Sequence, residues 1–426
     1  MRRFIVIIIL SGLSFSCLAA TPQDTLYYTS DHIEKVFLEN NLLLLAEKLN
    51  VDQAQARVIQ AGAWPNPTFT LDEIQVYKNS TTDQIPPLFG NFWRDRNVAA
   101  QLEQLIFTAR KRRKNITLAA DSKEMAETVL KDLLLTLKTE LRQTVADVFY
   151  IQQVRDSWYV QLEEIGKLVR AHQSQYSTGY ISEAELLRLK ALEVSLHSSI
   201  IELEEEMSEK QNSLRNLLFI PPTSHLVVTD TLAVNKPAAI VAHHSLADLL
   251  KLSEQNSQLK ITQSQLKVSE SQLAVEKANA VPNISLIASY DRNGSVMRDF
   301  VGVGVSMDLP FFDRNKGNIR AAQYAVSQSH LLEKNKRSEV QNAIARAWND
   351  LRLFTNLYEK IDKHYISRID TITFAISKNF AQHNISLLEF LDYYESFRES
   401  KQQYYQAIRN IINKKAELNY LTGEEL

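Results

Sequence analysis

The chain has 426 residues, in which 48 Lys and Arg stand against 50 Asp and Glu, so the formal net charge is −2. This balance argues against a nucleic acid partner, which requires a concentrated basic surface. Gly and Pro number only ten each. Because both residues interrupt helices, their scarcity favours long helices over a small, turn-rich fold.

The N-terminus predicts an export signal. Arg2 and Arg3 precede the apolar run Phe4–Leu10, and small residues follow it, which is the order found in secretory signal peptides. We therefore expect residues 1–20 to be a signal peptide. No later stretch contains the roughly 18 to 20 consecutive apolar residues that a membrane-spanning helix needs. The mature protein is thus expected to be exported without a helical anchor.

Cys17 is the only cysteine and lies at the end of this signal, so no internal disulfide can form. Two interpretations stay open. Bacterial lipoproteins carry lipid on a cysteine at this place, which makes Cys17 a candidate lipidation site with cleavage just before it, although Ser14–Ser16 matches the usual signal poorly. Alternatively, cleavage after Ala19 or Ala20 removes Cys17 from the mature chain.

An internal repeat organises the sequence. Ala61–Phe69 recurs as Ala278–Leu286, with Pro65 matched to Pro282 at an offset of 217 (282 − 65). A second offset of 204 relates later segments of the two copies. Its pairs are Leu105 with Leu309, Phe107 with Phe311, Arg110 with Arg314, Ile181–Ser182 with Ile385–Ser386, Glu185 with Glu389 and Leu217 with Leu421. The offsets differ because the hairpin of the first copy is longer.

Each copy predicts the same order of elements: a helix, a strand hairpin and a pair of long helices. In the first copy we expect helices over 31–63, 116–172 and 182–218, with the second strand over 97–107. In the second copy we expect helices over 246–280, 318–380 and 386–421, and strands over 283–291 and 300–309. The domains are then a first repeat over 21–220, a linker or equatorial segment over 221–244 that packs against the helices, and a second repeat over 245–426.

The strand over 301–309 alternates strictly, with Val, Val, Val, Met and Leu on one face and Gly, Gly, Ser and Asp on the other. In a soluble sandwich the polar face would meet bulk water. In a membrane barrel it would line a lumen while the apolar face met lipid. Strands of about ten residues suit a tilted crossing of a bilayer. Four strands cannot close a barrel, so several subunits would share one, and three would supply twelve strands.

The sequence predicts two tandem copies of one unit, which is a helix, a hairpin preceded by prolines and a pair of long helices. This arrangement resembles the TolC family of outer-membrane efflux factors. The resemblance rests on Ala61–Thr68 with its counterpart Ala278–Ser285, on Gly179–Ser182 before an amphipathic helix, and on the ending Leu421–Gly423. It covers nearly the whole mature chain. The segment Trp64–Pro67 and the compact length are most similar to the CzcC and CusC branch, which serves heavy-metal cation pumps.

The resemblance implies a mainly α protein with membrane β. It implies a homotrimer, with a 12-stranded β-barrel in the outer membrane of a Gram-negative-type cell and a periplasmic α-helical barrel. The implied activity is passive export without catalysis or cofactor, with heavy-metal cations as candidate cargo. The implied partners are outer-membrane lipid, a periplasmic adaptor (membrane fusion) protein and an inner-membrane pump.

The resemblance also makes the turns between paired helices the periplasmic tips, which open and contact the adaptor. The predicted contact residues are Gly179, Tyr180, Ile181, Ser182, Asn384, Ile385 and Ser386. Family members often narrow this entrance with acidic rings. Residues 373–380 contain no Asp or Glu, so the candidate gate residues are Asp370 before the second turn and Glu389 after it.

Other patterns have structural explanations. The basic run Arg110–Lys114 follows a predicted membrane strand, where basic side chains extend to the bilayer edge, and a solvated helix start explains it nearly as well. His243 and His244 lack a third ligand at metal-binding spacing. The sequence has no catalytic or phosphate-loop motif. The alternative function is a periplasmic coiled-coil adaptor or scaffold without a pore, but such proteins usually have one helical hairpin where this sequence predicts two.

Overall fold

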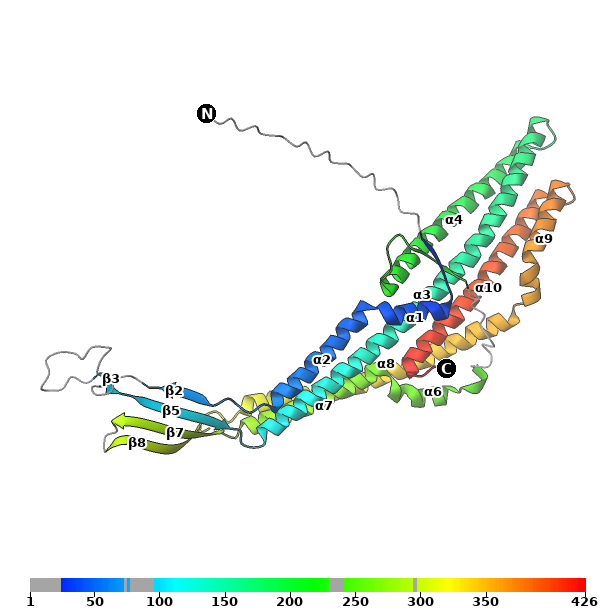
Figure 1. The fold of residues 1–426 in the computed structure, drawn as a ribbon. Helices are drawn as coiled ribbons and strands as arrows, with labels where there is room; N and C mark the ends of the chain where they lie inside the picture. The colour runs from blue at the N-terminus through cyan, green and yellow to red at the C-terminus, as the bar shows by residue number, and fades with distance from the viewer. Residues whose placement is uncertain (1–23, 73–74, 77–95, 230–240, 294–296) are drawn as a thin grey trace, which may run out of the picture. The chain divides into compact units, whose positions relative to one another are not determined.

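The computed structural model describes residues 24–72, 75–76, 96–229, 241–293 and 297–426. The chain divides into two compact units, each assembled from three stretches of sequence. The first comprises Met1–Asn41, Glu140–Asn235 and Leu357–Asn413, and the second comprises Leu42–Thr139, Lys236–Asn356 and Lys414–Leu426. Figure 1 labels the elements of both units and colours them in chain order.

The first unit is built on two hairpins of long helices. One joins α3 (Lys111–Ser177) to α4 (Glu183–Leu218), and the other joins α9 (Lys363–Ala381) to α10 (Leu387–Thr422). The early part of α3 and the end of α10 belong to the second unit. On α4 the buried apolar residues from 186 to 217 recur at spacings of three, four and seven, which places them on one face, and Leu218 follows directly. They are Leu186, Leu189, Leu196, Ile200, Leu203, Met207, Leu214, Leu217 and Leu218.

Contacts near the hairpin ends order these helices as α4, α3, α10, α9. Each neighbouring pair in this order is joined by at least one side-chain bond. Figure 1 shows the same order within this unit. The bonds are Lys190 to Gln173 for α4 and α3 (2.7 Å), Gln402 to Tyr150 for α10 and α3 (3.3 Å), and Lys401 to Asp370 for α10 and α9 (2.7 Å).

A short parallel strand pair packs beside the base of α4. β1 (Thr25–Tyr28), which precedes α1 (Ser30–Asn40), pairs with β6 (His225–Val228). Leu226 is fully buried. The side-chain amide of Gln211 on α4 bonds both main-chain groups of Leu226, accepting from its N–H (2.9 Å) and donating to its C=O (2.6 Å). The segment predicted as a linker over 221–244 therefore contains a strand that the sequence analysis did not predict.

The second unit joins a helical part to a sheet. Its helices are α2 (Leu42–Gly62), α6 (Leu246–Leu252), the single turn η1 (Ser253–Gln255), α7 (Ser257–Asn279) and α8 (Lys316–Lys360), whose last residues belong to the first unit. Asp132 on α3 is buried and accepts hydrogen bonds from Ser257 of α7 (2.5 Å) and Tyr420 of α10 (3.1 Å). These bonds fix how α3, α7 and α10 are aligned.

The sheet contains one hairpin from each repeat. Its strands lie in the order β2 (Thr68–Leu71), β5 (Ala99–Ile106), β7 (Ile284–Asn293) and β8 (Arg298–Met307), and every neighbouring pair is antiparallel. Two further short strands, β3 (Gln75–Val76) and β4 (Arg96–Asn97), pair with each other. The β5–β7 pair joins the two repeats, and β2 and β8 are the end strands of the sheet.

Three helices that the sequence predicted as continuous are broken in the structure. The helix predicted over 31–63 is α1 and α2, the helix over 246–280 is α6, η1 and α7, and the helix over 318–380 is α8 and α9. In the third case Asp362 caps α9, since its side chain accepts from the N–H of His364 (2.9 Å). The side chain thus replaces helical hydrogen bonds that the break removes.

The other two breaks have a different interaction in common. Asn41 and Asn256 are both buried, and each donates from its side-chain amide to a carbonyl near the end of the last helix of its own repeat. Asn41 bonds Leu217 (3.1 Å) and Asn256 bonds Leu421 (3.1 Å). Leu217 and Leu421 are also paired by the 204-residue offset, so the kink belongs to the repeat.

Candidate functional site

The two helical hairpins end in turns of the same construction. After α3 the chain turns at Gly179 (φ 76°), and after α9 it turns at His383 (φ 57°), both in the left-handed region. In each turn the following N–H reaches back five residues. Tyr180 donates to Gln175 (3.0 Å) and Asn384 donates to Asn379 (2.9 Å), which satisfies carbonyls at the helix ends. The second turn thus places His where the first has the less strained Gly.

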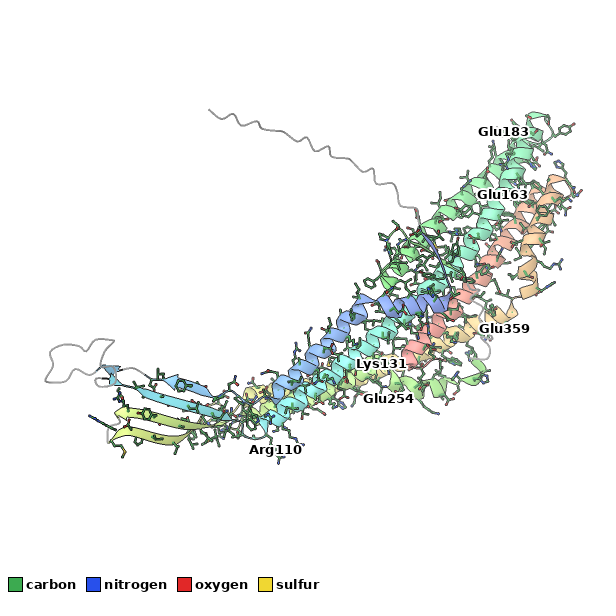
Figure 2. The ribbon with its side chains drawn as sticks, viewed as in Figure 1. Arg110, Lys131, Glu163, Glu183, Glu254 and Glu359 are labelled. Atoms are coloured by element: carbon green, nitrogen blue, oxygen red, sulfur yellow. The ribbon has the colours of Figure 1, made fainter. Side chains whose placement is uncertain are left out.

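Reciprocal caps begin the helices that leave these turns. Ser182 accepts from the N–H of Glu185 (3.2 Å), whose carboxylate accepts from the N–H of Ser182 (3.3 Å). Ser386 and Glu389 form the corresponding pair at α10 (3.2 and 2.8 Å). The backbone N–H and hydroxyl of Ser386 both donate to Glu389 and hold the pKa of that carboxyl below its usual value. Figure 2 labels Glu183, in the first turn of α4.

Aromatic rings join the two hairpins near their ends. The ring of Phe380 on α9 stacks on Phe390 of α10 (centroids 4.6 Å apart) and on His172 of α3 (4.9 Å). His172 is buried and its Nδ1 lies 2.9 Å from the carbonyl of Leu168. The same apolar cluster also contains Ile165, Leu168, Val169, Leu189, Leu387 and Tyr394.

A cavity of about 360 Å³ lies between the hairpin ends, beside these rings. Both capping carboxylates and both histidines of the region line it, so its wall is largely polar. Gln175 also reaches across, with its Nε2 3.3 Å from Nε2 of His383. The lining residues are His172, Ile181, Glu185, Phe380, His383, Asn384, Ile385, Ser386, Leu387 and Glu389.

The predicted contact residues all lie in the two turns. Tyr180 is the most exposed of them, at 83%. Ile181 and Ile385 are half-buried beside the cavity, while Gly179, Ser182, Asn384 and Ser386 are exposed. Predicted residue Cys17 lies outside the residues that the structure describes.

The two candidate gate residues have different surroundings. Both carboxylate oxygens of Asp370 accept hydrogen bonds from Lys401 (2.7 and 2.8 Å), so the pair joins α9 to α10. The side chain of Lys401 is only 12% exposed. The carboxylate of Glu389 is used in the cap of α10. A change at Asp370 therefore loosens the contact between α9 and α10, and a change at Glu389 loosens the cap of α10.

The sheet has one apolar and one polar face, which confirms the predicted alternation. Cross-strand rows of apolar side chains run Phe69, Leu102, Ala288, Val303 and, next to it, Leu71, Ala100, Tyr290, Val301. The row between them, on the opposite face, is Thr70, Gln101, Ser289, Gly302.

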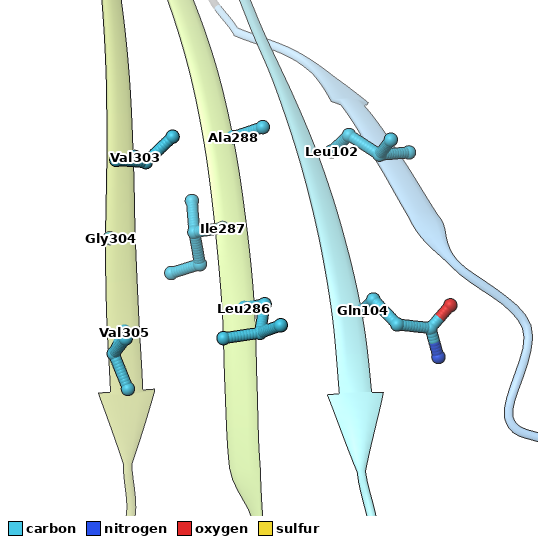
Figure 3. Close-up of a pocket in the computed structure, with 8 residues that line it drawn as sticks. All are labelled: Leu102, Gln104, Leu286, Ile287, Ala288, Val303, Gly304 and Val305. Carbon is cyan, nitrogen blue, oxygen red and sulfur yellow. The ribbon is translucent and has the colours of Figure 1, made fainter.

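The apolar face is open to its surroundings. Val303 is 91% exposed and Val305 is 71% exposed. Figure 3 shows both beside Leu102, Leu286 and Ala288, from three neighbouring strands. Exposed apolar surface of this continuity marks contact with lipid or another protein.

The basic run begins α3 at the base of the sheet. Lys111 is buried and donates to the carbonyl of Val281 (2.5 Å) and to Asn283 (2.7 Å). Arg112 donates to the carbonyl of Gly62 (2.7 Å) and its guanidinium lies 4.9 Å from the Trp64 ring centroid. Two of the five cations in the run therefore tie the start of α3 to the segments that lead from α2 and α7 into the hairpins, a role that the sequence analysis did not assign to them.

Sequence analysis missed three side chains of the hairpin ends: His172, Phe380 and His383. Each is an isolated ring in a helical pattern, and only the packing of two hairpins brings them together. The repeat carried a usable signal for one of them, because His383 stands where the first copy has Gly179.

Among the described helices, none combines the length and the apolar character that a membrane-spanning helix requires. Within the residues that the structure describes, no three side chains of His, Cys, Asp or Glu are grouped so that they would hold a metal ion.

The chain matches the family model described as outer membrane efflux protein, over residues 35–218 and again over 249–424. Its fold also matches solved structures. CusC, described in terms of transmembrane channel formation, is 15% identical with a TM-score of 0.72, covering 99% of each chain. The outer membrane protein VceC from Vibrio cholerae is 14% identical with a TM-score of 0.72, covering 93% of this chain and 96% of its own. The CmeC outer membrane channel of Campylobacter jejuni is 13% identical with a TM-score of 0.71, covering 92% and 85%. A comparison with curated proteins gave no match.

Proposed function

Because the chain belongs to the family of outer membrane efflux proteins, we propose that it is the channel subunit of a tripartite efflux system. The protein is an outer-membrane transport protein that extends into the periplasm, and it is not an enzyme. Its role is passive: it provides a conduit, and a partner supplies the energy. The observation that carries this proposal is the four-stranded sheet with one exposed apolar face and one polar face.

The proposed assembly is a homotrimer with a 12-stranded barrel. Each chain supplies four strands, and the end strands β2 and β8 have main-chain groups that a neighbouring copy would pair. In lipid such groups require partners, because no water is available to bond them. The polar rows would then line the lumen and the apolar rows would face the hydrocarbon.

The hairpin turns are the proposed contact with the periplasmic adaptor, which in turn binds an inner-membrane pump. Tyr180, exposed beyond the end of α3, and Asn384, at the equivalent place in the second repeat, support this assignment. Tyr180→Ala combined with Asn384→Ala should abolish export-dependent resistance in cells while leaving the conductance of the purified protein unchanged. Glu202→Ala, an exposed change further along α4, is the control and should have no effect on either.

Asp370 and Glu389 are the proposed gate residues. Removal of the Asp370–Lys401 contact by Asp370→Asn should loosen α9 from α10 and raise the fraction of time that the channel is open. Equal open fractions for the variant and the parent would argue against a gating role for Asp370.

Heavy-metal cations are the proposed cargo. This finer assignment rests on the resemblance of Trp64–Pro67 and of the chain length to the CzcC and CusC branch. Cells that lack the protein should lose tolerance to divalent or monovalent metal ions and keep tolerance to organic drugs. The opposite pattern would assign the channel to drug export.

The experiment that tests the channel itself is single-channel recording of the purified protein in a planar bilayer, with its mass in detergent measured alongside. Discrete conductance steps from a particle of three chains support the proposal. A protein that stays in the aqueous fraction as a monomer and never conducts refutes it, and leaves the adaptor or scaffold alternative.

A further inference from the structure

A cavity of about 460 Å³ lies at the base of the sheet, where strands and helices join. Three parts of the chain line it: Lys111 at the start of α3, the segment between α7 and β7, and the segment between β8 and α8. All three belong to the second unit. Figure 2 labels Arg110, the residue before Lys111. The volume is in the range of sites that bind small molecules.

Lys111 brings a positive charge to this cavity that no carboxylate neutralises. The residue is only 7% exposed. Its ammonium donates to two neutral acceptors, the carbonyl of Val281 (2.5 Å) and the side-chain oxygen of Asn283 (2.7 Å), and it forms no ion pair within the described part of the chain. An ammonium has three donors, so one N–H remains for a ligand. Because a buried charge is costly unless it is paired, an anionic group is the ligand expected here.

Two carboxylates, those of Asp308 and Asp313, line the same cavity. Asp308 is exposed and, among the described residues, makes no hydrogen bond or ion pair of its own. Asp313 accepts a hydrogen bond from the N–H of Asn315 (2.8 Å). Since neither carboxylate pairs with Lys111, the cavity presents a positive charge and a negative charge that are separate. A ligand that carries both a phosphate and an ammonium group matches this arrangement.

The internal repeat indicates that the fold does not require these charges. The 204-residue offset relates the junction of β5 with α3 to the junction of β8 with α8. The pairs are Lys111 with Asn315, Gln104 with Asp308 and Ala109 with Asp313. The first copy therefore forms its junction without either carboxylate, and the second copy forms its junction without the lysine. The three charges come together once in each chain, where the two repeats meet.

Exposed apolar side chains flank the charged groups. Phe312 is fully exposed, Leu309 is 58% exposed and Val281 is 42% exposed, and all three line the cavity. The last row of the apolar face of the sheet ends beside them, with Met307 paired to Ile284. A charged site that adjoins apolar surface has the two chemistries of a phospholipid, whose polar headgroup continues into hydrocarbon.

We propose that this cavity binds the headgroup of a phospholipid that carries a primary amine, of the phosphatidylethanolamine class. Lys111 donates to the phosphate, and the carboxylates of Asp308 and Asp313 accept from the ammonium of the lipid. Phe312 and Leu309 contact the apolar part next to the headgroup. The inference rests on the proposed function, in which the base of the sheet lies at the periplasmic edge of the outer membrane, and it names the lipid that this edge selects.

Native mass spectrometry of the full-length protein in detergent tests the selection. Phosphatidylethanolamine is compared with phosphatidylcholine and phosphatidylglycerol of the same chain length. The parent should bind phosphatidylethanolamine with a Kd roughly tenfold lower than that of either other lipid, because only its headgroup can donate to the carboxylates. Asp308→Asn should remove this preference, and Asp52→Asn, an exposed change on α2, should keep it. Equal affinities of the parent for the three lipids, or an unchanged preference in Asp308→Asn, overturn the inference.

The lysine needs a separate test, because it also ties the start of α3. Lys111→Met should raise the Kd for phosphatidylethanolamine by roughly tenfold or more, since the phosphate loses its charged donor. Arg113→Met, an exposed change in the same basic run, should bind the lipid as the parent does. Circular dichroism checks that helix content is unchanged. A folded Lys111→Met that binds the lipid as tightly as the parent overturns the inference, and the Asp308→Asn result decides if Lys111→Met does not fold.

Free phosphoethanolamine separates a lipid from a soluble ligand of the same chemistry. Displacement of the lipid by an equal concentration of free phosphoethanolamine overturns the lipid as the occupant. The outcomes also separate this inference from the channel proposal. A conducting trimer with no preference among the three lipids refutes the site and leaves the channel intact. A soluble monomer that never conducts refutes the channel and, with it, the lipid, even if it binds free phosphoethanolamine.

Discussion

Replacement of Asn256 should weaken the junction between α7 and α10. Asn256 is completely buried. Its Oδ1 accepts from the N–H of Leu259 (3.0 Å) and its Nδ2 donates to the carbonyl of Leu421 (3.1 Å). Asn256→Ala removes a helix cap, about 1 kcal/mol, and leaves a buried carbonyl without its donor, about 1–3 kcal/mol. The combined loss of about 3 kcal/mol corresponds to roughly a hundredfold rise in the local opening equilibrium.

Hydrogen exchange followed by mass spectrometry measures this opening directly. In the purified protein, peptides that cover 415–426 should exchange roughly a hundredfold faster in Asn256→Ala than in the parent. Asn50→Ala is the control, because Asn50 is an exposed residue of α2 that bonds only the nearby Glu47 (2.9 Å) among the contacts seen. Exchange within about threefold of the parent in Asn256→Ala would refute the reasoning.

Three further changes have defined outcomes. Gly423→Ala should lower the midpoint of thermal unfolding, with a loss of about 1–2 kcal/mol in the free energy of unfolding. The reason is that φ is +72° and a Cβ would lie 2.9 Å from the carbonyl oxygen of Gln255. An unchanged midpoint would contradict this. His383→Gly should gain about 1 kcal/mol by relieving the left-handed turn, and a lower midpoint would show that its ring contacts outweigh the strain. The hydrogen bonds from Ser386 lower the pKa of Glu389 below its ordinary value of 4.5. The cap of α10 is therefore complete above pH 4.5 and is lost as the pH falls through the lower pKa of the folded state. Glu389→Gln should abolish this acid sensitivity, measured as the rate of proteolysis in the turn.

The sequence predicted the repeated architecture well, for identifiable reasons. Helices of 36 and 67 residues, such as α4 and α3, contain many periods of apolar spacing, so the pattern is unmistakable. The strand over 301–309 alternates at every position, and the observed register places its valines in rows with Leu102 and Leu286. These elements carry their own pattern and need no distant partner to be recognised.

The features that were missed depend on distant partners. A single Asn within a helical pattern is tolerated, so Asn41 and Asn256 gave no sign of a break. Each helix breaks where the Asn side chain bonds a carbonyl at least 165 residues away in the sequence. β1 has four residues and pairs with a strand 200 positions later. The cluster of His172, Phe380 and His383 exists only because two hairpins pack together.

The four-stranded sheet also constrains how the protein is made. Its end strands, β2 and β8, present rows of main-chain N–H and C=O groups along their outer edges. A lone copy placed in hydrocarbon would leave these groups without partners, at a penalty of several kcal/mol each. In the proposed trimer, copies would therefore meet before their strands enter the bilayer, and biogenesis would shield the two end-strand edges of each chain during transit through the aqueous compartment.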